Sequence, residues 1–202
     1  NPVKIKVKSV RSDRNKPKNI GCFFSGGVDS FYTYLKNKQK INQLIFVHGF
    51  DINIHNLSLY SKIRRNIVNI SKEESINLIE VKTNIRDMQD QYCPWTISHP
   101  FALASVSLFL RNGLREIYMS CGLPNKNTDH HFMTPDLDIL WSTETMNINH
   151  YGCVADKIDK IKYISKFDIV LKNLRVCWVN KKDAYNCSEC EKCLRNMLGL
   201  YI

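Results

Sequence analysis

Two groups of residues in this sequence have the types and the spacing that chemistry requires. The first is the hexapeptide Ser-Gly-Gly-Val-Asp-Ser at positions 25–30, and the second is a group of four cysteines between positions 177 and 193. Consecutive glycines let an oxyanion approach the backbone closely, and thiolates at short spacing bind zinc. The sequence therefore predicts an anion site early in the chain and a metal site late in it.

The hexapeptide separates a pattern typical of a buried strand, Ile20–Phe24, from one typical of a helix, Phe31–Lys38. In that order the free N–H groups at a helix N-terminus face an anion, and a phosphate is the expected one. Ser25 and Ser30 add hydroxyl donors, and Asp29 can cap the helix or hold Mg²⁺ beside the phosphates. The alternative is an ordinary strand-to-helix turn in which the glycines only tighten the chain.

The motif lacks both the Gly-Lys-Ser/Thr ending of a Walker loop and the Gly-x-Gly-x-x-Gly pattern. It resembles the PP-loop of the N-type ATP pyrophosphatases, which cleave ATP to AMP and pyrophosphate while they adenylate a carbonyl oxygen of a substrate. The resemblance implies that the pyrophosphate part of ATP is bound by Ser25, Gly26, Gly27, Val28, Asp29 and Ser30. Asp29, the expected magnesium ligand, is the candidate catalytic residue of the loop.

The rest of the chain predicts an α/β fold with a doubly wound parallel sheet, and the resemblance implies the HUP type of adenine nucleotide alpha hydrolases. Short apolar runs alternate with helical patterns, which favours parallel pairing. The further strands are expected at Gln43–Val47, Leu78–Val81, Glu116–Ser120 and Leu174–Trp178, and the longer helices at 56–74, 100–110, 156–174 and 194–200. Residues 123–150 are expected to form a long irregular substrate loop.

Three residues are expected near the adenosine because they follow a strand or begin a helix at the ligand-binding edge of such a sheet. His48 and Asp51 come after the second expected strand, and His99 comes at the start of the apolar helix. The alternative is that the histidines only cap a loop and a helix.

Lys157 and Lys160 lie one turn apart in a helical pattern and so share nearly the same face. Members of the resembled family often place a lysine near the triphosphate in this region, which makes Lys160 a candidate catalytic residue. The alternative is a solvated surface lysine.

The cysteine group predicts a closed tetrahedral site, because one distant thiolate and three at two-residue gaps can reach a single ion. Its members are Cys177, Cys187, Cys190 and Cys193. Structural Zn²⁺ is the expected occupant, and an iron–sulfur cluster is the alternative. Ligand spacing is absent from the other four cysteines: Cys22, Cys93, Cys121 and Cys153. A metal site at Asp129, His130 and His131 is disfavoured because adjacent histidines point in different directions.

The loop, the cysteine group and Arg195 after it together resemble the 7-cyano-7-deazaguanine synthase branch of the PP-loop family. That branch uses ATP to activate a carboxylate and ammonia to convert it into a nitrile, and its four cysteines bind structural zinc. After the second expected strand the branch has Tyr-Gly-Gln-Arg-His, whereas this chain has His-Gly-Phe-Asp-Ile-Asn at 48–53. We therefore expect fold, ATP cleavage and zinc to carry over, with a different carboxylate or amide as the small-molecule substrate.

The domain organisation is expected to follow these motifs. Residues 1–18 are expected to be a strand and linker, either the end of an upstream domain or an added edge strand, 19–176 the ATP-binding domain, and 177–202 the zinc knuckle with a terminal helix. Apolar runs stay below the ~20 residues that span a bilayer, which predicts a cytoplasmic protein without a membrane partner. The net charge of +10 invites an RNA partner, but the lysines are scattered, so a solvated basic surface is favoured.

Two other functions remain open from the sequence. A PP-loop tRNA thiolation enzyme would need a labile cluster or a persulfide-carrying cysteine, for which Cys121 is the best placed after a strand. The other is a nucleotide-binding module without catalysis, within a homo-oligomer or a larger assembly. The intact Ser25, Asp29 and Ser30 argue against it, because binding alone has less need of the complete hexapeptide.

Overall fold

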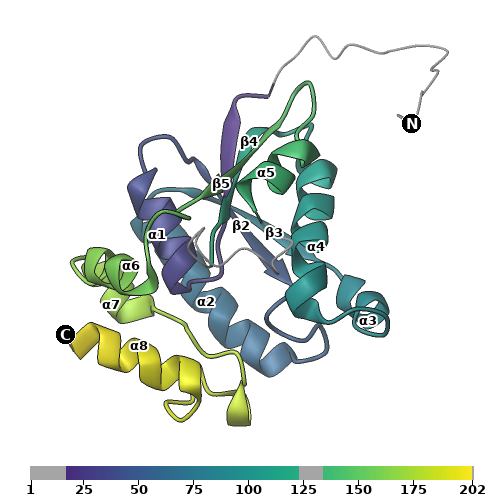
Figure 1. Ribbon diagram of the computed structural model, residues 1–202. Helices are drawn as coiled ribbons and strands as arrows, with labels where there is room; N and C mark the ends of the chain where they lie inside the picture. The colour runs from purple at the N-terminus through teal and green to yellow at the C-terminus, as the bar shows by residue number, and fades with distance from the viewer. Residues whose placement is uncertain (1–16, 123–133, 202) are drawn as a thin grey trace, which may run out of the picture.

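The computed structural model describes residues 17–122 and 134–201 and contains a five-stranded sheet (Figure 1). All four strand pairings are parallel, in the order β3-β2-β1-β4-β5. The strands are β1 Asn19–Phe23, β2 Gln43–His48, β3 Asn77–Lys82, β4 Leu114–Ser120 and β5 Asn147–Tyr151. The predicted α/β parallel sheet is confirmed.

Helices cover both faces of the sheet. They are α1 Val28–Lys36, α2 Leu57–Glu73, α3 Ile85–Gln89, α4 Trp95–Leu110, α5 Pro135–Asp138, α6 Lys157–Ile164, α7 Asp168–Asn173 and α8 Glu191–Tyr201, with short 3₁₀ turns at Ile139–Trp141 and Lys181–Asp183. One apolar core joins one face to α1, α2, α6 and α7, and a second joins the other face to α4. None of the helices in the described ranges is both long and apolar enough to cross a membrane.

The central strands are apolar throughout because both of their faces are covered. Along β1 and β2, Cys22 and Leu44 enter the core with α1 and α2, whereas Phe23 and Ile45 enter the core with α4. Every residue of β2 is buried, but the edge strand β3 is only partly buried. The apolar runs in the sequence therefore identified the middle of the sheet most clearly.

Several helices differ from their predicted bounds, among them α8, which begins at Glu191 instead of at residue 194. Helix α1 begins at Val28, inside the hexapeptide, and α4 begins at Trp95, so that Pro100 lies in its interior rather than in its first turn. The single helix expected at 156–174 is two helices, α6 and α7. Helix α4 was expected to be buried on most faces, but Phe101 and Phe109 are exposed.

Two predictions about the last strand were wrong. Strand β5 lies within the stretch expected to be irregular, and residues 174–178 form no strand. The backbone of the latter segment is bound elsewhere: the Asn186 side chain accepts from the N–H groups of Val176 and Cys177 and donates to the Leu174 carbonyl. These groups are thus satisfied without a neighbouring strand.

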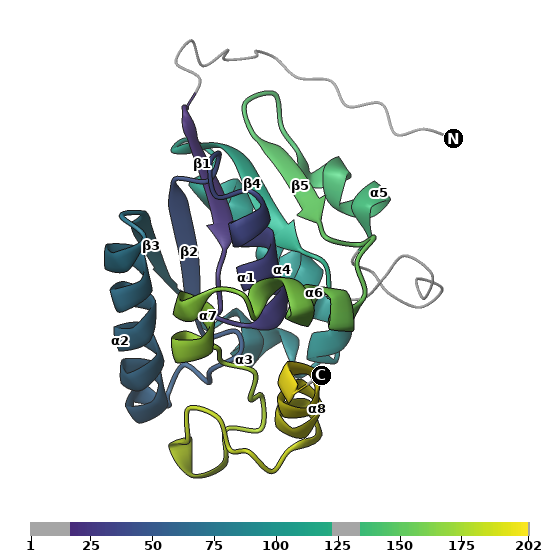
Figure 2. The ribbon, with the colours of Figure 1, turned by 90° about the vertical axis from the view of Figure 1, so that its left-hand side faces the viewer.

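The strand order reverses direction between β1 and β4. The chain moves outward from β1 to β2 and β3, then returns through α4 to place β4 on the other side of β1. Ligands of open parallel sheets bind beyond the carboxyl ends of the strands at such a switch point. Figure 2 shows α8 lying beyond this edge, below the ends of β1 and β4.

We predict that Gly49→Ala destabilises the fold by roughly 3 kcal/mol, because a left-handed backbone and a backbone clash both oppose a side chain there. Gly49 follows β2 with φ of +108°, and an added Cβ would lie 1.8 Å from the Thr83 carbonyl oxygen. Chemical denaturation measures the change. Gly113→Ala is the control, since its added Cβ would meet only the Leu110 carbonyl at 3.7 Å. Equal midpoints for the two variants would contradict the prediction.

Candidate functional site

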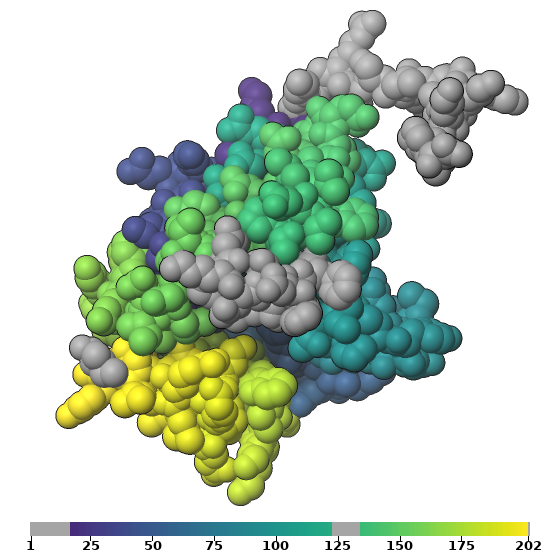
Figure 3. Space-filling model, viewed as in Figure 1, coloured from purple at the N-terminus to yellow at the C-terminus, as the bar shows by residue number. Residues whose placement is uncertain are grey.

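A cavity of about 300 Å³ lies at the switch point of the sheet. Its walls come from several parts of the chain: the loop between β1 and α1, β2 with the loop after it, the start of α4, the end of β4, Lys157 of α6, and the C-terminal segment with α8. In the space-filling view α8 (yellow) packs beside the α6–α7 region (green) at the bottom of the molecule (Figure 3). The C-terminal segment therefore supplies one wall of a cavity whose other walls belong to the sheet and the loops at its edge.

The hexapeptide forms the floor of this cavity, and the two glycines in it differ. Gly26 has φ of +77°, a conformation that favours glycine, whereas Gly27 has φ of −84° and is the N-cap of α1. Of the two, Gly26 alone therefore uses the conformational freedom of glycine. At Gly27 a side chain would make a tight contact, because an added Cβ would lie 3.3 Å from Ser25 Oγ.

The N-terminus of α1 has no side-chain cap. Its first N–H groups lack partners within the helix and carry the positive end of the helix dipole. Ser25, Gly27, Val28, Asp29 and Ser30 all line the cavity. The Ser30 hydroxyl donates to the Gly27 carbonyl at 3.0 Å, so it braces the turn.

The loop is held in place from the C-terminal side of the chain. The Arg175 N–H donates to the Gly26 carbonyl at 2.9 Å. The Arg175 side chain is 5% exposed, lines the cavity and donates from Nη2 to the Asn180 side chain at 2.7 Å. Its Nε is buried without a hydrogen-bond partner in the described part of the protein. Arg175 thus reaches the cavity with donor capacity left over.

Asp29 is the centre of a small charge network. Its carboxylate receives Lys157 Nζ at 2.5 Å and Lys160 Nζ at 3.1 Å. Lys160 is 1% exposed and also donates to the Cys121 carbonyl at 2.6 Å. Burial lowers the pKa of Lys157, while the Asp29 carboxylate acts in the opposite direction. Lys157 lines the cavity, and Lys160 lies behind Asp29.

Cationic groups outnumber carboxylates around the cavity. Lys157, Arg175, Lys192 and Arg195 line it, against the carboxylates of Asp29 and Asp51. Asp29 is already paired with lysines, and Arg195 has an exposed partner, Glu191, at 3.1 Å. The field in the cavity is therefore positive and favours an anionic ligand.

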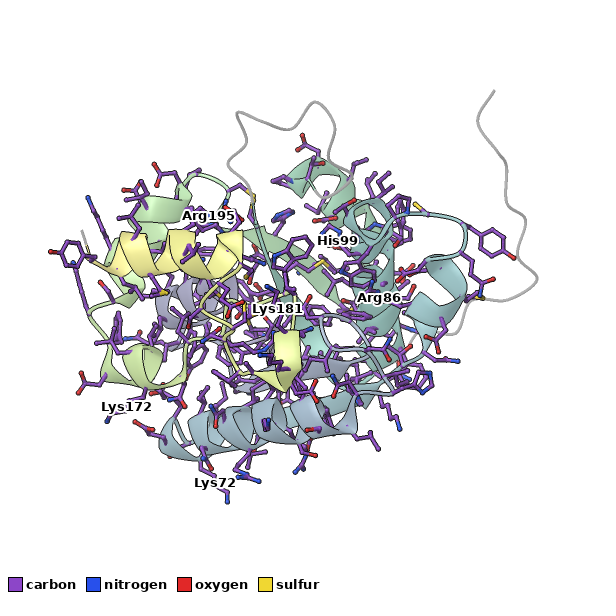
Figure 4. All side chains as sticks on the ribbon, turned by 90° about the horizontal axis from the view of Figure 1, so that it is seen from below. Lys72, Arg86, His99, Lys172, Lys181 and Arg195 are labelled. Carbon is purple, nitrogen blue, oxygen red and sulfur yellow. The ribbon has the colours of Figure 1, made fainter. Side chains whose placement is uncertain are left out.

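The three residues expected near an adenosine separate into two groups. Asp51 and His99 line the cavity, together with Phe50 and Trp95. Figure 4 labels His99 on α4 and Arg195 on α8, the two helices that contribute to opposite walls. Burial lowers the pKa of His99, and its Nδ1 lies 3.1 Å from the Trp95 carbonyl.

His48 does not line the cavity. It is buried as the last residue of β2, and its ring stacks on Tyr60 with centroids 3.9 Å apart. Burial lowers the pKa of His48, as expected for a packed neutral imidazole. The geometry places it in the core of the sheet rather than beside a ligand.

The four C-terminal cysteines converge as their spacing predicts. The sulfurs of Cys177, Cys187, Cys190 and Cys193 all lie within 4.8 Å of one another, and the Cys187 and Cys193 sulfurs are 3.9 Å apart. Tetrahedral Zn–S bonds of about 2.3 Å require sulfurs about 3.8 Å apart. The cluster can hold a metal ion, and its size is compatible with structural zinc.

A second cluster was missed by the sequence analysis. Cys121, His150 and Cys153 bring their ligand atoms within 4.8 Å of one another. Cys121 and Cys153 lack ligand spacing along the chain, as expected, but the fold brings them together. Parallel pairing of β4 with β5, which aligns Met119 with His150, brings them together.

Other contributions were hidden from sequence reasoning for a similar reason. Arg175 stands in no recognisable motif and Lys192 is a non-ligand position within the cysteine group, so only the fold shows that both line the same cavity as the loop at 25–30. The expected elements at residues 1–16 and the group Asp129, His130 and His131 lie outside the described residues.

The fold and the sites define a parallel α/β protein with an anion-attracting cavity and a four-cysteine cluster. No family model matches the chain, and no curated protein matches it.

We predict that Asp29→Asn lowers the free energy of unfolding by about 2 kcal/mol, because it leaves the buried Lys160 ammonium without a counter-charge. Denaturation at neutral pH measures the loss. Asp159→Asn is the matched control, since Asp159 is exposed on α6 and should change stability by only about 0.5 kcal/mol. If the Asp29 variant were as stable as the control, the contacts of Asp29 with the two lysines would make no net contribution to stability.

Proposed function

We propose that this protein binds ATP in the cavity and cleaves it to AMP and pyrophosphate while it activates an oxygen of a carboxylate or amide substrate. The observation that carries the proposal is the convergence of an uncapped helix N-terminus and four cationic side chains on one cavity. A polyphosphate matches this arrangement because it offers several negative charges in a row. The resemblance of the loop at 25–30 to the PP-loop supports the same ligand.

In this proposal the β- and γ-phosphates lie on the first N–H groups of α1. The backbone approaches them closely at Gly27, and Lys157, Arg175 and Arg195 neutralise their charge from the other walls. Phe50 and Trp95 offer aromatic surface to the adenine. Asp51 and His99 are the polar groups nearest to the nucleoside end, whereas His48 acts through the packing of the β2 loop.

The reaction follows from this placement. A substrate oxygen attacks the α-phosphorus, the bond to the bridging oxygen breaks, and pyrophosphate leaves with the electron pair. Preorganised N–H groups and cations stabilise the charge that develops on the leaving group. Mg²⁺, when bound beside the phosphates, supplies further neutralisation, with Asp29 as its candidate ligand. A nitrogen nucleophile such as ammonia then displaces AMP.

Lys160 has a different role in this proposal from Lys157. Its ammonium donates hydrogen bonds to Asp29 and to the Cys121 carbonyl, so we propose that Lys160 positions Asp29. Lys157 lines the cavity and is the lysine that can contact a phosphate.

We also propose that the four-cysteine cluster holds structural Zn²⁺. Four protein ligands leave no open position, which is typical of a structural site. Cys193 lies in α8 and Cys177 follows the segment that binds Gly26, so one ion would tie together the two walls that carry Arg175 and Arg195.

We predict that Lys157→Gln lowers the rate of AMP and pyrophosphate release from Mg-ATP about 100-fold, because it removes one group that stabilises the leaving charge. The assay contains a panel of carboxylates with ammonia, and the substrate that stimulates release identifies the acid. Lys162→Gln is the control, since Lys162 is exposed on the same helix.

Release of ADP and phosphate would contradict this chemistry. Binding of ATP without any pyrophosphate release would instead favour a nucleotide-binding module without catalysis.

We predict that Cys190→Ser removes the metal and speeds hydrogen exchange in α8 by about 100-fold or more, because metal binding contributes directly to local folding. Exchange of peptides from β1 and β2 should stay unchanged. Cys93→Ser is the matched control, since Cys93 is also half-buried and belongs to neither cysteine cluster. Unchanged exchange in α8 of the Cys190 variant would show that the helix docks without the ion.

A further inference from the structure

The second cluster lies where β4 and β5 end, on the face of the sheet that α5 covers. Cys121 directly follows β4, His150 is the fourth residue of β5, and Cys153 comes two residues after that strand. Their ligand atoms lie within 4.8 Å of one another. Two thiols and an imidazole are a ligand set that zinc and related ions prefer.

An aspartate stands behind the histidine. Asp138, at the end of α5, places Oδ2 2.5 Å from His150 Nδ1, and both side chains are 1% exposed. A histidine that binds a metal commonly has its other ring nitrogen held by a carboxylate, which fixes the orientation of the ring. Cys121, Cys153 and His150 could therefore bind an ion directly, while Asp138 would orient the histidine.

The polar atoms of this pair are incompletely satisfied. Asp138 Oδ1 is buried without a hydrogen-bond partner among the described residues, whereas Asp138 Oδ2 and His150 Nδ1 face each other as an ion pair. Buried polar atoms are almost always paired, so the unpaired oxygen shows that the surrounding protein atoms do not fully satisfy this buried pair. An ion bound to the ring nitrogen that does not face Asp138 would leave the carboxylate to hold the ring in its orientation.

We propose that Cys121, His150 and Cys153 bind a second metal ion, with zinc as the expected one. Each cysteine would bind as a thiolate after losing its proton, and the two negative charges would neutralise a divalent cation. Three protein ligands leave a fourth position, as in sites that bind water or a substrate group. This centre is independent of the four-cysteine cluster, which has its own complete ligand set.

The position of this centre relates it to the cavity. Ser120 and Gly122, the neighbours of Cys121, line the cavity, and Lys160 joins the Cys121 carbonyl to Asp29 of the phosphate loop. A metal ion there would fix the ends of β4 and β5 beside the nucleotide site. The inference stands without ATP cleavage, because it rests on the ligand set alone.

The test is the metal content of the purified full chain, measured by inductively coupled plasma mass spectrometry. We expect about two metal ions per chain in the wild type and about one in the Cys121→Ala/Cys153→Ala variant, because each complete ligand set binds one ion. Cys22→Ala is the control for removing a buried thiol outside both clusters, and it should keep both ions.

Three further measurements decide the question if the double variant does not fold. Wild-type protein that holds about one ion per chain, lost on Cys190→Ser, overturns the proposal, as does a Cys121–Cys153 disulfide found by peptide mass spectrometry. Asp138→Asn should weaken the binding of the ion at Cys121, His150 and Cys153 about 10- to 100-fold in competition with a chelator, and leave the affinity of the four-cysteine cluster unchanged. Equal affinity in that variant would overturn the role given to Asp138.

Discussion

The contact between Asp29 and Lys160 joins the parts of the molecule on which the cavity depends. Asp29 belongs to the first turn of α1, Lys160 to α6, and the Cys121 carbonyl, which also binds Lys160, to the end of β4. An isolated ammonium in the interior costs several kcal/mol, so Lys160 is tolerable there only because a carboxylate and a carbonyl receive it. Both strands at the switch point of the sheet are thereby fixed to one helix.

The order of the central elements could be read from the sequence because local signals agree there. The glycines at 26–27 mark the turn after β1, and the apolar run of β2 is buried on both faces. Strand β5, with the sequence NINHY, lacks that signal because it is an edge strand with polar residues. Residues 174–178 imitate a strand in their apolar pattern, yet their backbone pairs with the side chain of Asn186, which no local pattern reveals.

The candidate sites show the same division between local and distant information. The four-cysteine cluster was predictable because three of its ligands lie within seven consecutive residues. The cluster of Cys121, His150 and Cys153 depends on the register of β4 against β5, which follows from tertiary pairing. Spacing also suggested Lys160 as a candidate, but only its burial behind Asp29 separates its role from that of Lys157.

The dependence of the cavity on the C-terminal segment has a thermodynamic consequence. Arg175, Lys192 and Arg195 line the cavity, and the cysteines at 177–193 fix the same segment. A ligand in the cavity and an ion at those cysteines would both favour the docked segment over the undocked one. Each would then raise the affinity for the other by the same factor, because linkage between two binding equilibria is reciprocal. The four-cysteine cluster, of which Cys177 alone lines the cavity, would in this way set how tightly an anion is held there.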